Sequence, residues 1–206
     1  MAQYKGLIED YKRKKKDIKK RLKEFGEVSK TNAEEIFSEL CFCLLTPQSN
    51  ARHCDKAIQE LKKTNLLFNG CIRAIRPVLR GKSRFHNKKA KYIVNARRCF
   101  DKSVLNANNA CEIRERLVKK IKGLGYKEAS HFLRNIGLGE RIAILDRHIL
   151  KNLKRYGVIK KIPSSVTART YLDIEEKVRA FAKKIKIPLK ELDLLFWSKE
   201  TGEIFK

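Results

Sequence analysis

The sequence predicts an all-α protein, built as two helical lobes with a cleft between them. Two observations predict this fold class. Apolar residues recur at helical spacing over almost all of the 206 residues. No segment shows the convincing alternation of apolar and polar residues that is typical of strands. Because there is also no internal repeat and no low-complexity linker, residues 1–206 are interpreted as a single unit of two lobes.

The first predicted helix has an apolar face and a basic face. The apolar face comprises Tyr4, Ile8, Tyr11, Ile18, Leu22 and Phe25. The basic face comprises Lys12, Arg13, Lys14, Lys16, Lys19, Lys20 and Arg21. This basic face is either a surface that touches phosphate or an ordinary solvated helix surface.

Capping signals place the next two helices. The segment Thr31-Asn32-Ala33-Glu34 has the form of a capping box and predicts the start of a second helix. Pro47 ends that helix, because proline disfavours helical backbone at the residue before it. Ser49 or Asn50 can cap a third helix over about Ala51 to Leu61.

Apolar periodicity predicts the remaining helices. They cover about 69–80, 88–100, 109–121, 126–136, 147–156, 173–186 and 188–197. Pro188 is expected at the first helical position of the last one, because its missing N–H has no helical partner there.

The charge balance predicts a polyanionic partner. Lys plus Arg is 49 and Asp plus Glu is 23, so the formal net charge is +26. Mutual repulsion of so many cations destabilises a compact chain, and nucleic acid is the partner that best explains the excess. An anionic membrane surface is the alternative. No run of about 18 apolar residues is present and the N-terminus has no apolar signal core, so we expect a soluble, cytoplasmic protein.

The six cysteines all lie within the first 111 residues. None forms a C-x-x-C pair and no histidine follows at zinc-finger spacing, which argues against a structural zinc site. Several fall within apolar helical patterns, where a reduced thiol behaves as a small buried hydrophobe. The absence of cysteine after Cys111 excludes an iron–sulfur cluster built from the C-terminal part.

Residues 109–137 have the pattern of a helix, a tight turn and a second helix. The turn is Gly123-Leu124-Gly125, in which the glycines permit positive φ and close approach to a phosphate, while Leu124 packs the turn. Free N–H groups at the start of the second helix form an anion site. This helix-hairpin-helix pattern binds a DNA backbone without reading its sequence, although a G-x-G between helices is often only a helix end and a turn.

Two ionisable residues stand close to this hairpin in the sequence. Lys127 falls at the start of the second helix, and Asp146 follows 19 residues later, directly before Arg147 and His148. Asp146 is predicted to be the N-cap of the next helix, and the helix N-terminus helps to keep its carboxylate ionised.

Four segments together carry a resemblance to a known family. "LTPQSN" (45–50), "FHNKKA" (85–90), "GLGYKEA" (123–129) and "LDRHI" (145–149) resemble, in order, the motifs of the helix-hairpin-helix DNA glycosylase superfamily. The chain lacks the C-terminal four-cysteine cluster of the endonuclease III branch. Its ending, "FWSKETGEIFK" (196–206), resembles instead the tail of the small type 2 8-oxoguanine DNA glycosylases, which are found mainly in archaea.

The resemblance implies a base-excision repair enzyme that is both a glycosylase and an AP lyase. The damaged base is flipped out of the duplex, because its glycosidic bond is hidden in the stack. Lys127 is then the nucleophile at C1′ and Asp146 stabilises positive charge on the sugar. The resulting Schiff base acidifies the 2′ proton, and β-elimination nicks the strand. Neither a metal nor an organic cofactor is needed.

The resemblance also implies roles in DNA binding. Gly123, Leu124 and Gly125 hold backbone phosphate, and Arg147 and His148 contact phosphate at the next helix start, although His148 could equally be a buried structural histidine. The expected partner is double-stranded DNA with a damaged base, bound by a monomer that is associated with the nucleoid.

Two further pairs of residues are expected around the flipped nucleotide. Gln48 fills the gap left in the duplex, and Phe85, in the polar segment that includes Arg84, is either a wedge beside the orphaned base or a core aromatic. Trp197 stacks on the damaged base, and the terminal carboxylate of Lys206 accepts from its N1–H and 2-amino group. The apolar tail is therefore expected to be docked, either to close the base pocket or merely by hydrophobic packing.

Two other functions remain open from the sequence. One is a glycosylase for oxidised pyrimidines, and the other is a non-catalytic helix-hairpin-helix module that binds DNA. The second would have no need of both Lys127 and Asp146.

Overall fold

The computed structural model describes residues 2–206, which contain eleven α-helices and two short 3₁₀ helices. No strand occurs within these residues, so the all-α prediction is confirmed. The helices are α1 (Lys5–Val28), α2 (Ala33–Leu45), α3 (Ala51–Lys63), α4 (Leu66–Asn69), α5 (Ile72–Leu79), α6 (His86–Cys99), α7 (Ala110–Lys120), α8 (Tyr126–Asn135), α9 (Arg147–Arg155), α10 (Ala168–Ile185) and α11 (Leu189–Thr201). None of the described helices is long and apolar enough to cross a membrane.

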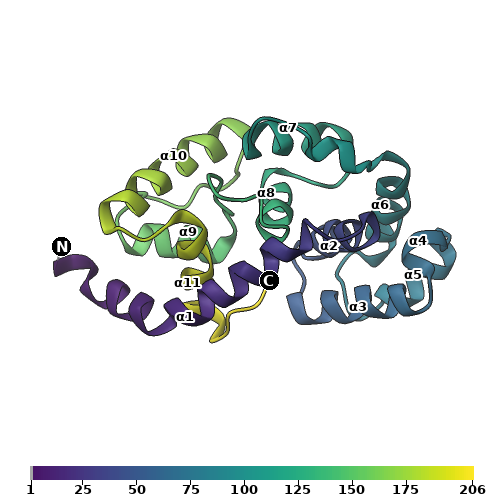
Figure 1. Ribbon diagram of the computed structural model, residues 1–206, viewed down its shortest axis with the longest axis horizontal. Coiled ribbons are helices and arrows are strands. Elements are labelled where there is room, and N and C mark those ends of the chain that lie inside the picture. Colours follow the sequence, from purple (N-terminus) through teal and green to yellow (C-terminus); the bar gives the residue numbers. More distant parts are fainter. Residues whose placement is uncertain (1) are drawn as a thin grey trace.

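The helices form two lobes, as predicted (Figure 1). One lobe has a core built from α2 to α8, with Leu40, Phe42 and Phe132 fully buried. The other has a core shared by α1, α9, α10 and α11, with Ile18 and Phe196 fully buried. Helix α8 packs against both α2 and α1, and so joins the lobes. The chain ends between the two groups of helices (Figure 1).

The capping box predicted at Thr31 is wrong by one residue. The N-cap of α2 is Asn32, whose side chain accepts from the Glu35 N–H at 2.9 Å. The Thr31 hydroxyl instead donates to the Val28 carbonyl at 2.7 Å. Thr31 therefore closes the end of α1, which leaves the following asparagine to begin α2. Asn50, one of the two predicted candidates, caps α3.

The helix predicted over 69–80 corresponds to α5, and the short helix α4, which precedes it, was not predicted. The chain is extended at Gly70, where an added Cβ would lie 2.5 Å from the Leu66 carbonyl oxygen. Only glycine allows this close approach, which separates the two helices although apolar spacing continues through them.

The last two helices are longer than predicted. Helix α10 begins at Ala168, because Thr167 caps it by accepting from the Thr170 N–H. Helix α11 continues to Thr201, where Gly202 ends it with a φ of 82°. Pro188 is the N-cap of α11, one position before the first helical residue where it was expected. Because residues near these two helix ends are polar, the spacing of apolar residues does not indicate the boundaries.

A buried ion pair positions the segment that leads into α9. Arg114 of α7 and Glu175 of α10 are fully buried and form a bidentate pair at 2.7 and 2.9 Å. Glu175 also accepts from the Ala143 N–H at 2.8 Å, and the Tyr171 hydroxyl donates to the Ala143 carbonyl at 2.6 Å. These bonds fix the chain three residues before Asp146, and removing one partner would leave a buried charge uncompensated.

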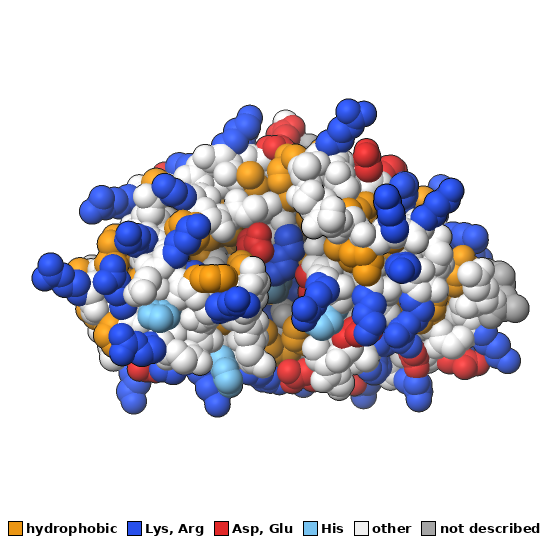
Figure 2. Space-filling view, turned by 180° about the vertical axis from the view of Figure 1, so that it is seen from behind, with side chains coloured by type: hydrophobic (Ala, Val, Ile, Leu, Met, Phe, Trp, Pro, Cys, Tyr) orange, Lys and Arg blue, Asp and Glu red, His pale blue; other side chains and the backbone are white. Residues whose placement is uncertain are grey.

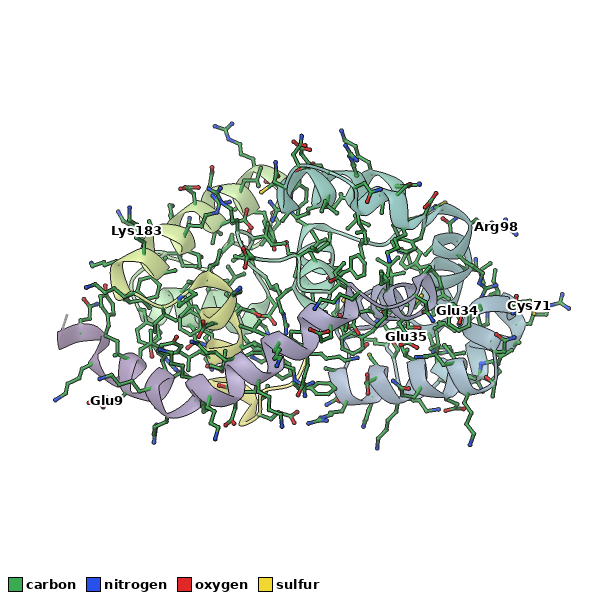
Figure 3. The ribbon with its side chains drawn as sticks, viewed as in Figure 1. Glu9, Glu34, Glu35, Cys71, Arg98 and Lys183 are labelled. Carbon is green, nitrogen blue, oxygen red and sulfur yellow. The ribbon has the colours of Figure 1, made fainter. Side chains whose placement is uncertain are left out.

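The cysteines lie mainly in the lobe of α2 to α8. Cys41, Cys43 and Cys54 are buried free thiols, which confirms the prediction that several cysteines act as small hydrophobes. Burial raises the pKa of the Cys54 thiol above its ordinary value. Cys71 is exposed and lies at the outer end of its lobe, away from the centre of the molecule (Figure 3).

Candidate active site

The predicted hairpin is present between α7 and α8. Gly123 has a φ of 93°, and a Cβ there would lie 2.4 Å from the ring of Tyr92, so no larger residue fits. Leu124 is buried, as expected for the residue that packs the turn. Gly125 is the N-cap of α8 and has a φ of −90°, so the expectation of positive φ is wrong for this glycine. It precedes the free N–H groups of α8.

A cleft of about 680 Å³ lies between the lobes. The face opposite to that of Figure 1 is hollowed between them, with basic and acidic side chains inside the hollow (Figure 2). The cleft brings together eight of the predicted site residues: Gln48, Arg84, Lys127, Asp146, Arg147, His148, Trp197 and Lys206. Four others, Gly123, Leu124, Gly125 and Phe85, are not among the residues that line it.

Lys127 stands in the first turn of α8, directly after the hairpin. Its side chain is 23% exposed and lines the cleft. Its Nζ atom lies 3.7 Å from Glu128 Oε1, which is an ion pair but not a hydrogen bond. Within residues 2–206 no hydrogen bond holds this amine, which lines the cleft.

Asp146 is the N-cap of α9, as predicted. Its Oδ1 atom accepts from the Ile149 N–H at 2.8 Å. The cap fixes the carboxylate at the wall of the cleft that Lys127 also lines. Capping and a chemical role are compatible, because a carboxylate has acceptor capacity beyond one cap bond.

The structure adds cleft residues that the sequence analysis missed. His131 and Arg134 follow Lys127 by four and seven positions on α8, and Asp193 precedes Trp197 by four on α11. Helical periodicity could have found all three, because these spacings place them on the faces of Lys127 and Trp197. Together with Lys127 and Asp146, these three residues form what we call the pocket wall.

Two charged members of the pocket wall form a buried pair. Arg134 Nε lies 3.4 Å from Asp193 Oδ2. Burial raises the pKa of Asp193 to about 6, against the opposing effect of Arg134, and the nearby Asp146 carboxylate raises it further. Burial lowers the pKa of Arg134. Both shifts follow desolvation, so this is a pair whose mutual attraction does not fully offset its removal from water.

The pocket wall also contains buried polar atoms without hydrogen-bond partners in the protein. Within the described chain, both ring nitrogens of His131, Nε and Nη1 of Arg134 and Oδ2 of Asp193 are buried and make no hydrogen bond. Burial, followed by repulsion from Arg134, Lys127 and Lys206, lowers the pKa of His131 well below its ordinary value. Since buried polar groups in folded proteins nearly always have partners, this wall is suited to a polar ligand.

The C-terminal tail is docked, as predicted. Phe205 is buried under the guanidinium of Arg52, which lies 3.9 Å from its ring centroid. Lys206 Nζ lies 3.0 Å from both Glu39 Oε2 and Asp55 Oδ1. Burial by itself would lower the pKa of this amine, but the two carboxylates outweigh it and raise the pKa. The tail therefore joins the lobes at one end of the cleft.

Residues 46–51 and Arg84 also line the cleft, and we call residues 46–51 together with the segment 83–85 the turn wall. Gln48 and Phe85 have φ values of 54° and 58°, in the left-handed region that non-glycine residues seldom adopt. Phe85 is 51% exposed and is therefore not a core aromatic. Its ring lies 4.9 Å from the guanidinium of Arg84.

Comparison with known proteins agrees with this geometry. The family model described as 8-oxoguanine DNA glycosylase matches residues 18–187. A relative from Fusobacterium nucleatum named 8-oxoguanine DNA glycosylase/AP lyase is 46% identical over 205 residues, covering 95% of this chain and 94% of the relative. A relative of the same name from Methanocaldococcus jannaschii is 40% identical, covering 92% and 91%.

Solved structures are also similar over nearly the full length. The Methanocaldococcus jannaschii 8-oxoguanine glycosylase/lyase, in complex with a 15mer DNA containing 8-oxoguanine, has a TM-score of 0.88 at 37% identity and covers 97% of this chain and 99% of its own. The 8-oxoguanine DNA glycosylase of Thermotoga maritima has a TM-score of 0.90 at 33% identity, covering 98% and 97%. The chain belongs to the helix-hairpin-helix 8-oxoguanine DNA glycosylase family.

Proposed function

We propose that this protein flips 8-oxoguanine out of duplex DNA, excises it through a Schiff base on Lys127 and nicks the strand by β-elimination. One observation carries the proposal. A single cleft, next to a helix-hairpin-helix, contains the amine of Lys127, the carboxylate of Asp146, and Trp197 beside the terminal residue Lys206. A non-catalytic DNA-binding hairpin has no use for such a cleft.

The chemistry begins at C1′ of the flipped nucleotide. The neutral amine of Lys127 attacks this carbon, the glycosidic bond breaks, and the base leaves with the bonding electrons and gains a proton. Asp146 stabilises the positive charge that develops on the sugar. Loss of a proton from the nitrogen and opening of the sugar ring give the imine. The imine then acidifies the 2′ proton, and its removal expels the 3′ phosphate.

The hairpin and the start of α9 are assigned to the DNA backbone. The free N–H groups that follow Gly125 provide an anion site at the positive end of α8. Arg147 and His148 begin α9 and line the cleft, where their side chains are suited to bind phosphate. We expect one monomer to bind one duplex.

The turn wall is assigned to the DNA that remains stacked. Gln48 fills the space that the flipped nucleotide leaves, and Phe85 enters the stack beside the orphaned base. The exposure of Phe85 supports this assignment, because the ring can enter the duplex without being removed from a core. Arg84 lies over that ring and lines the cleft, where its cation faces the phosphate backbone.

The pocket wall and the tail are assigned to the base. Trp197 offers a flat face for stacking. The terminal carboxylate of Lys206 accepts from N1–H and the 2-amino group, an arrangement of donors that an oxidised pyrimidine does not present. The docked position of Phe205 supports this assignment, because it holds the last residue at the cleft.

A panel of duplexes tests the proposal, with 8-oxoguanine, thymine glycol or undamaged guanine at the same position. Each reaction is analysed with and without heat and alkali, so that base release and strand cleavage are scored separately. We expect cleavage of the 8-oxoguanine strand without alkali and little reaction of the other two. Preference for thymine glycol would favour the oxidised-pyrimidine enzyme, and binding without any cleavage would favour the non-catalytic module.

A further inference from the structure

The two loops of the turn wall depend on one buried lysine. Lys89, in the first turn of α6, is only 4% exposed. Its Nζ atom donates to the carbonyls of Leu45 and Pro47, both at 2.7 Å. It also donates to the hydroxyls of Ser49 and Ser83, both at 3.0 Å. An ammonium has three N–H groups, so these four acceptors share all of its donor capacity.

The acceptors come from segments that are far apart in the sequence. Leu45, Pro47 and Ser49 belong to the end of α2 and the turn after it, whereas Ser83 precedes α6. Further hydrogen bonds join the same segments. The Ser83 hydroxyl donates to the Leu45 carbonyl at 3.0 Å, and the Arg84 N–H donates to the Ser49 hydroxyl at 2.9 Å. Lys89 thus forms hydrogen bonds to both loops of the turn wall and joins them to each other.

The environment of this amine is unusual for a buried cation. All four of its acceptors are neutral carbonyls or hydroxyls. Burial lowers the pKa of Lys89 to about 8. A buried charge held only by dipoles is costly, so stability alone does not explain a lysine here. The same loops hold Gln48 and Phe85 in left-handed backbone, which is disfavoured unless the surroundings enforce it.

We propose that Lys89 is a positioning residue, which ties the turn carrying Gln48 to the segment carrying Arg84 and Phe85 so that both enter the DNA duplex as one rigid unit. The inference rests on the proposed roles of Gln48 and Phe85. Lys89 touches neither the substrate nor the reacting atoms, because its amine is enclosed by the loops themselves. Its effect is on nucleotide flipping and not on the chemistry of Lys127.

Substitution Lys89→Met tests this, because methionine keeps the length of the side chain but cannot donate. Flipping is followed by the fluorescence of 2-aminopurine placed beside 8-oxoguanine in a duplex, which rises when the bases unstack. We expect flipping by the variant to slow at least about tenfold, as for the loss of a hydrogen bond to a charged group. Cleavage of a ready-made abasic site in single-stranded DNA should stay near the wild-type rate, because nothing has to be flipped there.

Two controls separate positioning from a general loss of structure or charge. Lys88→Met removes the same charge from the exposed neighbouring residue, and at saturating protein it should flip like the wild type. In a background of Gln48→Ala and Phe85→Ala, Lys89→Met should add little further effect, because residues that act as one unit are not additive.

Three results would overturn the inference. They are wild-type flipping by Lys89→Met, a parallel loss of its single-strand lyase activity, and a full additive effect in the Gln48→Ala/Phe85→Ala background. If the wild-type protein excises 8-oxoguanine and the double variant Gln48→Ala/Phe85→Ala flips the nucleotide at the wild-type rate, the roles assigned to these two residues are refuted. This inference is then refuted with them. A wild-type protein that neither flips nor excises would defeat the proposed function itself.

Discussion

The two walls of the cleft differ in how far their polar groups are satisfied. In the turn wall, the amine of Lys89 and the hydroxyls of Ser49 and Ser83 bond one another and the nearby carbonyls. In the pocket wall, His131 and Arg134 leave buried nitrogens without partners in the described chain. Ser83 and Lys89 on one side and His131 and Arg134 on the other are all buried, so the difference between these groups does not arise from exposure to solvent.

The polar groups of the turn wall find their hydrogen-bond partners within the protein, whereas we expect those of the pocket wall to find partners in the ligand. A satisfied network keeps its geometry in the free protein, which suits a wall that must displace stacked bases. Buried polar groups without partners in the protein are available to bond a polar molecule that enters the cleft, and a base that does so displaces water from them. Substitutions in the pocket wall should therefore impair base removal, whereas those in the turn wall should impair flipping and discrimination.

The largest effect in this comparison is expected from Asp146→Asn. Asparagine is also a good N-cap, so the bond to the Ile149 N–H and the fold are kept. The lost carboxylate should slow excision of 8-oxoguanine on the order of 10²-fold, the lower end of the range for removing one group that stabilises transition-state charge. Single-turnover excision measures this, with thermal unfolding as the control. Wild-type excision by this variant would show that Asp146 only caps α9.

A smaller effect is expected from deletion of Lys206. Removing the terminal carboxylate from the cleft should slow excision of 8-oxoguanine at least about tenfold, since a hydrogen bond to a charged group is worth about 1.5–3 kcal/mol. Cleavage of a ready-made abasic site should persist, because no base is recognised there. Lys206→Ala is the matched control, since it loses the amine that contacts Glu39 and Asp55 but keeps a terminal carboxylate. Equal rates for the deletion and the wild type would make the tail purely structural.

In the turn wall, Phe85→Ala should reduce the enzyme's discrimination between lesions and between opposite bases by a few-fold to about tenfold. This is the range expected for loss of an aromatic contact worth about 1–1.5 kcal/mol. Binding to undamaged duplex should change less, because the ring acts only after flipping. The ring is half exposed, so stability should change by less than about 1 kcal/mol. Phe37→Ala is the contrasting control, since Phe37 is buried and its loss should cost about 3–5 kcal/mol. A similar loss of stability at Phe85 would contradict its placement.

The smallest effect concerns the pH dependence of stability. The pKa of His131 lies well below that of an unfolded histidine, which is about 6.5. The unfolded chain therefore binds the proton first as the pH falls, so the stability from this group is complete above pH 6.5 and is lost below it. Melting temperatures at pH 7 and pH 5 should differ less for His131→Gln than for the wild type. An equal difference would mean that His131 accepts its proton in the folded state.

The hairpin turn and the helix start at Asp146 could be predicted from the sequence because their signals are local. Gly123 and Asp146 mark a turn and a helix start within a few residues, and the structure has both. The motifs at 45–50 and 85–90, which carry the family resemblance, include Gln48 and Phe85 of the turn wall. The docked tail was predictable because Phe205 is an apolar residue at a chain end that would otherwise fray.

Other features could not be predicted because they depend on tertiary contacts. The ion pair of Arg114 and Glu175 joins residues 61 positions apart. Lys89 belongs to the motif at 85–90, but nothing in that motif indicates that its amine is enclosed by acceptors from residues 45–49 and 83. Nothing local indicates the left-handed backbone of Gln48 and Phe85, since neither is a residue type that favours it.

Borohydride trapping tests the central claim most directly, because it fixes the covalent bond between Lys127 and C1′ of the sugar. The wild-type protein, incubated with an 8-oxoguanine duplex and borohydride, should give a covalent adduct that peptide mass spectrometry locates at Lys127. Lys127→Gln keeps the size and polarity of the side chain but cannot form an imine, and should give none. An adduct of equal yield with Lys127→Gln, or one located at another lysine of the wild type, would contradict the account.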